Sequence, residues 1–148
     1  MEKQNYVLFE ANEEFAITQN QFDHDGKLFF STNGATWEKW KKSSGHKMKS
    51  EGGKLYLRGL KNTYMRDFYV DSSDTCRIKV SGNIESLLDY EEVDAGKHPS
   101  MREFAFSKLF AYSNVADASE LALTPKELTK GCYDEMFCQC KSLTKAPA

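Results

Sequence analysis

Short runs of alternating apolar and polar residues, separated by turn signals at roughly 10-residue intervals, constrain the fold of residues 1–98 most strongly. Between Thr75 and Ser81, for example, Cys76, Ile78 and Val80 alternate with polar side chains. Such alternation places one face of a strand in solvent and the other against a core. Regular turn signals between the runs are typical of an antiparallel sandwich. The sequence therefore predicts an antiparallel β-sandwich over residues 1–98, with strands near 6–10, 14–18, 27–31, 55–58, 67–71 and 75–81.

Asn33 and Gly34 follow the third run directly and predict a tight hairpin turn, because both residue types tolerate positive φ. The returning strand would carry Trp37 and Trp40. Three positions apart on one strand, the two rings would face opposite sides, so we expect one in the core and the other at the surface. An exposed tryptophan beside lysines could stack on a sugar or anchor a protein partner. The alternative is an aromatic side chain that only covers the edge of the sandwich.

The apolar spacing changes from two residues to three and four after Pro99. Ser100 with Glu103, and Thr124 with Glu127, have the spacing of helix capping boxes. This pattern predicts that helix appears only after Pro99.

The same region contains an internal similarity. Residues 106–110 match residues 133–137 at an offset of 27, and Ser113 matches Cys140 at the same offset. Val115 pairs with Leu143 only if one residue is inserted. A pattern that recurs at this spacing favours stacked repeat units, because one unit alone cannot bury its apolar face. We therefore expect residues 99–148 to form a small α/β segment of stacked repeats.

Several classes of function are not expected from the composition. The formal net charge is −2 and no basic block is present, which argues against nucleic acid as a partner. No apolar run is long enough for membrane insertion. The cysteines lack the CxxC spacing of structural zinc, so we expect Cys132 and Cys140 to be buried, unbridged thiols. Residues 23–26 hold only part of a calcium loop. The sequence predicts no metal, no cofactor, no catalytic residues and no enzyme.

The C-terminal stretch resembles one unit of the BspA-like leucine-rich repeats. The matching positions are Cys132, Tyr133, Met136, Phe137, Cys140, Ser142, Leu143, Thr144, Ala146 and Pro147. Residues 30–37, 55–59 and 81–88 resemble the β-rich domain that often precedes those repeats. The resemblance implies two parts, a β-sandwich-like domain over residues 1–98 and a leucine-rich-repeat segment over residues 99–148. That segment would hold one imperfect and one nearly full repeat.

Members of this family are surface proteins of gut bacteria that are implicated in adhesion, and similar cassettes occur in phages. The resemblance implies a non-enzymatic binding or adhesion module that acts through protein or glycan contacts at a cell or virion surface. A phage virion structural protein, such as a fibre, tail or capsid decoration component, is the alternative. No signal peptide is visible at the N-terminus, so the expected location is a cell surface for a trimmed chain, or a virion made in the host cytoplasm.

The last repeat also suggests where a partner would bind. Repeat arrays end with a capping unit whose outer face is polar. No such cap follows Tyr133, Met136, Phe137 and Leu143, so we expect these side chains to be binding candidates together with Trp37 and Trp40. We accordingly expect self-association, or contact with a protein partner, through residues 104–148.

Overall fold

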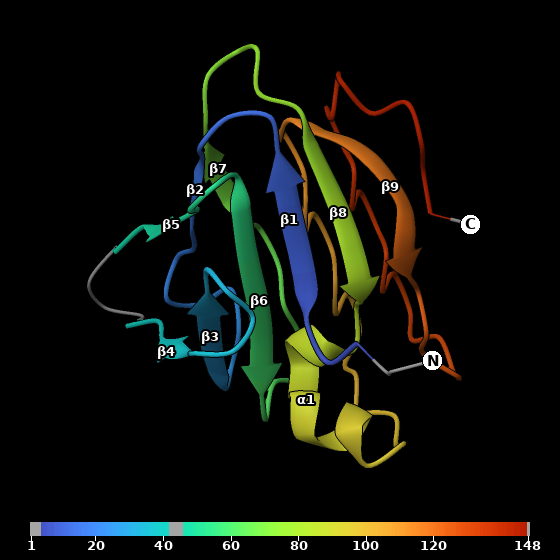
Figure 1. The fold of residues 1–148 in the computed structure, drawn as a ribbon. Helices are drawn as coiled ribbons and strands as arrows, with labels where there is room; N and C mark the ends of the chain where they lie inside the picture. The colour runs from blue at the N-terminus through green and yellow to red at the C-terminus, as the bar shows by residue number, and fades with distance from the viewer. Residues whose placement is uncertain (1–3, 42–45, 148) are drawn as a thin grey trace.

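The computed structural model describes residues 4–41 and 46–147, and it shows a mainly β protein (Figure 1). Within these residues, a six-stranded sheet has the order β4-β3-β6-β1-β8-β9 and a three-stranded sheet has the order β5-β2-β7. The predicted mainly β class is therefore confirmed. The elements in chain order are β1 (Val7–Ala11), β2 (Ala16–Thr18), β3 (Lys27–Ser31), β4 (Glu38–Lys39), β5 (Met48–Lys49), β6 (Lys54–Leu60), β7 (Tyr69–Asp71), β8 (Ile78–Asn83), α1 (Ser86–Asp94) and β9 (Val115–Ala122).

The larger sheet is mixed. Strand β1 pairs antiparallel with both β6 and β8, and β3 pairs antiparallel with β6 and β4. Strand β9 adds to the edge of β8 in the parallel direction. One cluster of buried apolar side chains includes residues from Val7 to Met136, so segments on both sides of residue 98 contribute to the same core. The division at residue 98 stays a prediction.

Period-two alternation works as predicted in the central strands. In β6, Leu55 and Leu57 are buried, whereas Tyr56 and Arg58 are half-buried on the opposite face. Behind this sheet the core contains Phe9, whose ring centroid lies 5.9 Å from that of Phe68 and 5.9 Å from that of Phe110. Edge-to-face pairs of this kind stabilise beyond the area that they bury.

The expected tight turn at Asn33 and Gly34 is wrong. Strands β3 and β4 are joined by a loop over residues 32–37, and only Gly34 of the pair has positive φ, at 75°. The Asn33 side chain organises this loop, because its Oδ1 accepts hydrogen bonds from the amides of Ala35 and Thr36, both at 2.8 Å. An asparagine that caps nearby amides in this way favours a wider turn.

The predicted position of helix is also wrong. Helix α1 lies before Pro99, and in the described residues after Pro99 the chain forms successive turns and strand β9 instead. The buried residues of α1 are Ser86, Leu87, Leu88 and Val93, which follow no single helical stripe. Asp89 also breaks the helical backbone in the middle of the element, with φ −159° and ψ 99°. The sequence therefore carried no helical period that could reveal α1.

Glycine allows α1 to approach the sheet closely. A Cβ atom at Gly59 in β6 would overlap with the carbonyl oxygen of Leu87 and with the Asn62 amide group. The Asn62 Nδ2 also donates to the carbonyls of Lys27 and Leu87, at 2.8 and 3.2 Å. Helix and sheet are thus joined by backbone contact as well as by side chains.

Candidate functional site

Two segments that lie 27 residues apart in the sequence stack on one another, and we call them the inner turns (residues 104–112) and the outer turns (residues 131–139). The rings of Phe106 and Tyr133 are stacked with centroids 6.0 Å apart, and those of Phe110 and Phe137 with centroids 5.4 Å apart. The Ser113 Oγ lies 3.7 Å from the Cys140 Sγ. The offset of 27 residues found in the sequence is therefore confirmed as a spatial pairing of equivalent side chains.

The backbone of both segments repeats every four residues. Left-handed φ values between 51° and 62° occur at equivalent positions of the two segments. These positions are Phe104, Lys108 and Tyr112 in the inner turns, and Gly131, Glu135 and Gln139 in the outer turns. Between them, amides bond to the carbonyl three residues earlier, as in the pair from Met136 to Tyr133 at 3.1 Å. A left-handed residue at every fourth position prevents helix, although the apolar spacing is the same as in a helix.

Hydrogen bonds between the two segments all run in one direction. Alternate amides of the inner turns, from Phe104 to Tyr112, donate to carbonyls of residues 130–138 at 2.8–3.0 Å. On the other side, the inner turns face residues 63–68, where the Met65 amide donates to the Ala105 carbonyl at 2.7 Å and the Phe68 amide to the Leu109 carbonyl at 2.9 Å. Between residues 65–68, the inner turns and the outer turns, each of these backbone hydrogen bonds thus runs from the earlier layer to the later one.

Strand β9 continues the stacking beyond the turns, but its hydrogen bonds run in both directions. Asp117 bridges Lys145 in the parallel direction, the Thr144 amide donates to the Ala116 carbonyl at 2.9 Å, and the Ala118 amide donates to the Lys145 carbonyl at 2.7 Å. These partners are offset by 28 residues in the bridge. The spatial pairing therefore includes the single inserted residue that the sequence comparison required.

The outer turns present an unused hydrogen-bonding edge. Their alternate amides have no hydrogen-bond partner among residues 4–41 and 46–147, although the equivalent amides of the inner turns are all paired. These amides belong to Gly131, Tyr133, Glu135, Phe137 and Gln139. In strands, such a row of free donors is a template for another chain.

The predicted binding side chains on this edge differ in exposure. Tyr133, Phe137 and Leu143 are half-buried, whereas Met136 is buried at 4% exposure and has no free surface for a partner. The Tyr133 hydroxyl is closed to solvent without a hydrogen-bond partner in the described chain. Burial raises the pKa of Tyr133 to about 12, with a smaller contribution from the negative charge of Glu85.

Cys132 and Cys138 in the outer turns, and Cys140 directly after them, are free thiols. Cys132 is buried as expected, at 4% exposure. Cys140 is only half-buried, and its Sγ donates to the Phe110 carbonyl at 2.9 Å. Within the described part of the chain, no group of three or more His, Cys, Asp or Glu side chains is arranged to hold a metal ion.

The two tryptophans separate as expected, one into the core and one to the surface. Trp40 is 1% exposed, and its Nε1 donates to the His46 carbonyl at 2.6 Å, so its burial leaves no ring surface for a ligand. Trp37 is half-buried on the outer face of the larger sheet, where the Arg58 guanidinium lies 4.0 Å from its ring centroid. Of the two, only Trp37 stays available as a binding residue.

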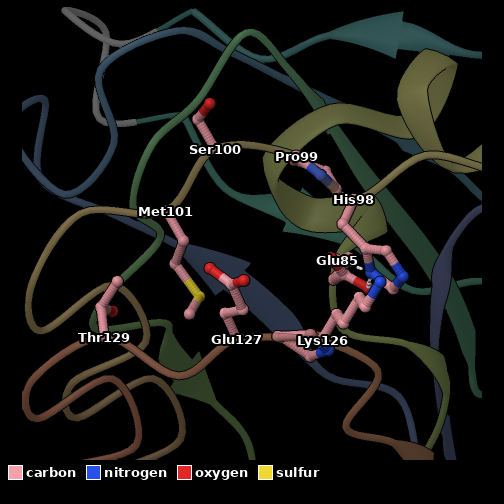
Figure 2. A pocket seen from close by; sticks show the side chains of 9 residues that line it. Glu85, His98, Pro99, Ser100, Met101, Lys126, Glu127 and Thr129 are labelled. Carbon is pink, nitrogen blue, oxygen red and sulfur yellow. Dashed lines mark hydrogen bonds and ion pairs between the residues drawn. The ribbon is translucent and has the colours of Figure 1, made fainter.

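Sequence reasoning missed a hollow of about 260 Å³ between residues 98–101, which follow α1, and the chain that follows β9 (Figure 2). Glu85, with 4% of its side chain exposed, accepts from His98 Nδ1 at 2.9 and 3.0 Å. Lys126 and Glu127 approach from the opposite wall (Figure 2). His98 gave no signal in the sequence, because its partner Glu85 lies before the helix that nothing predicted.

None of the helical residues that the structure describes forms a segment long and apolar enough to cross a bilayer. Comparison with protein-family models, with curated proteins and with solved structures finds no match.

Proposed function

We propose that this chain is a non-enzymatic binding or assembly module whose working surface is the edge of the outer turns. One observation carries the proposal, namely the row of unpaired amides from Gly131 to Gln139 beside the half-buried rings of Tyr133 and Phe137. An aligned row of backbone donors without partners in the described chain is suited to a partner that supplies acceptors.

The finer description of the fold is part of this proposal. The inner and outer turns would be the first coils of a leucine-rich-repeat solenoid that continues from a β-sandwich over residues 1–98. The stacked ring pairs and the hydrogen bonds between residues 104–112 and 130–138 support this interpretation. The BspA-like sequence resemblance adds the expected setting, which is the surface of a cell or a virion.

The polarity of the hydrogen bonds indicates which partner fits. The edge offers only donors, so two copies related by a two-fold axis would set donors against donors. The acceptor side of the inner turns is already engaged, because the Ala105 and Leu109 carbonyls accept from Met65 and Phe68. The expected partner is therefore a further coil of the same kind, contributed by another stretch of polypeptide, rather than the same edge of a second copy.

The test uses a chain extended after Ala148 by a second copy of residues 122–148, which has the length of the 27-residue offset. If the edge accepts a coil, the extension should raise the melting temperature by more than about 3 °C, the shift that 1 kcal/mol gives in a domain of this size. Phe137→Asp should abolish this gain, because an ionised carboxylate would be buried between the coils. Phe22→Asp, at a side chain that is 77% exposed in the loop between β2 and β3, should leave the gain intact.

Sedimentation velocity of the original chain completes the experiment. We expect no dimer of two-fold symmetry through the outer turns. An extended chain no more stable than the original, or an equal gain with Phe137→Asp, would contradict the proposed role of this edge.

A further inference from the structure

The outer face of the larger sheet carries a second surface, separate from the outer turns. In Figure 1 the outer face of β6, β1 and β8 is turned toward the viewer and no other element lies across it. Strand register places Lys39, Phe29 and Arg58 side by side on this face, because Phe29 is opposite both Lys39 and Arg58. Trp37 and Tyr90 join them from the loop before β4 and from α1.

Arg58 is held by aromatic rings. Its Cζ lies 4.0 Å from the ring centroid of Trp37 and 3.8 Å from that of Tyr90. Both rings are supported in turn, since Tyr56 packs edge-on against Trp37 at 6.5 Å and Phe29 against Tyr90 at 6.3 Å. Contacts with rings engage the faces of a guanidinium, so its N–H groups can bond only to acceptors in its own plane.

Among residues 4–41 and 46–147, no acceptor pairs with Arg58. No carboxylate pairs with Arg58 in the described residues, and its Nε is closed to solvent without a hydrogen-bond partner. A polar group that is desolvated without compensation is uncommon in a folded protein and is found at functional sites. Arg58 is therefore a fixed cation whose planar fork meets no anion in the part of the chain that the structure describes.

Charges on the strands around Arg58 favour an anionic partner, although α1 beside them also carries Asp89, Glu91, Glu92 and Asp94. The outward positions of β3, β4 and β6 carry Lys27, Lys39, Lys54 and Arg58, and none of them is Asp or Glu. The nearest outward carboxylate on a neighbouring strand is Glu10 of β1, which lies opposite Lys54. A fixed guanidinium matches a carboxylate through two parallel hydrogen bonds.

We propose that Arg58 and the rings of Trp37, Tyr56 and Tyr90 form a docking site for a protein segment that presents an Asp or Glu carboxylate. Trp, Tyr and Arg are the residue types that dominate the energetic centres of protein interfaces, where they are packed and largely desolvated. Because Arg58 engages the ring faces of both Trp37 and Tyr90, these rings offer less stacking surface to sugars or bases. The face thus favours an acidic peptide over a glycan or a nucleic acid.

The experiment titrates the full chain with a synthetic 12-residue peptide rich in Asp and Glu, followed by tryptophan fluorescence. Trp37 is the reporter, because Trp40 is buried. Arg58→Lys keeps the charge but removes the planar fork, and it should weaken peptide binding at least tenfold. Lys54→Met removes a charge from the same face away from the rings, and it should weaken binding less than threefold. Phe137→Asp lies in the outer turns and should leave the peptide affinity unchanged. A loss of peptide binding in Arg58→Lys therefore tests this docking site separately from the proposed role of the outer turns.

Three outcomes would overturn this proposal. The first is a peptide affinity that stays unchanged in Arg58→Lys while the unfolding midpoint falls, or while it too stays unchanged, because either result would leave the ring contacts without a role in binding. The second is a larger loss in Lys54→Met than in Arg58→Lys, which would indicate diffuse charge attraction. The third is tighter binding of a trimer of galacturonate than of the peptide, with the same sensitivity to Arg58→Lys, which would assign the site to an acidic glycan.

Discussion

Replacing Phe110 by alanine tests whether the turns and the sheets form one cooperative structure. Phe110 is completely buried, and its ring centroid lies 5.9 Å from that of Phe9, 6.3 Å from that of Phe68 and 5.4 Å from that of Phe137. The side chain thus connects β1, the chain before β7 and the outer turns. Removing a buried phenylalanine side chain costs about 3–5 kcal/mol, which is a large share of the ~5–15 kcal/mol that holds a domain folded.

Urea unfolding, monitored by tryptophan fluorescence, measures the loss of stability in Phe110→Ala at a distance from the mutation. The reporters Trp37 and Trp40 lie near the other end of the larger sheet. With a slope of about 2 kcal/mol per molar urea, the midpoint should fall by roughly 2 M. Tyr112→Ala is the matched control in the same turns, because Tyr112 is 75% exposed and should shift stability by less than about 0.5 kcal/mol. An unchanged tryptophan midpoint in Phe110→Ala would refute the shared core and would favour two independent folding units.

Three further substitutions test local features of the structure. Burial raises the pKa of Asp23 to about 6, so the folded state holds this proton more tightly than the unfolded chain, and stability should fall as the pH rises from about 4 to 7. Asp23→Asn should reduce that fall by about 1 kcal/mol after allowance for partial exposure, measured as the difference between the two pH–stability curves. Gly131→Ala should lower the unfolding free energy by about 1–2 kcal/mol in urea, because Gly131 has φ 62° and a Cβ there would overlap with the Phe104 ring; no loss would contradict the left-handed turn. Cys140→Ser should cost less than about 1 kcal/mol in thermal unfolding, because a hydroxyl can donate to the Phe110 carbonyl as the thiol does; a larger loss would show that the site needs the apolar sulfur.

Strand alternation and the 27-residue offset were the features that the sequence predicted best. Both depend on side-chain type at fixed spacing, as in Leu55 and Leu57 of β6 or in the stacked pair Phe110 and Phe137. The turns after Pro99 could not be distinguished from helix, because both structures place apolar residues three and four positions apart. The difference lies in left-handed backbone at residues such as Lys108, whose side chain gives no indication of it.

The two candidate sites differ in how much of each could be identified from the sequence alone. Tyr133, Phe137 and Leu143 were identified from the repeat pattern, but the polarity of their hydrogen-bonding edge follows only from how the layers pair. Arg58 was not identified at all, because Trp37 and Tyr90 are distant in the sequence and meet it only through strand register and the placement of α1.

Amide hydrogen exchange, followed by NMR on the original and the extended chain, tests the central proposal most directly. Amides of the inner turns, such as Phe106 and Phe110, should be protected in both chains, because they donate to the outer turns. The equivalent amides of Tyr133 and Phe137 should exchange rapidly in the original chain and become protected when a second copy of residues 122–148 follows Ala148. Protection of Tyr133 and Phe137 in the original monomeric chain, or no gain on extension, would contradict an open donor edge that accepts a further coil.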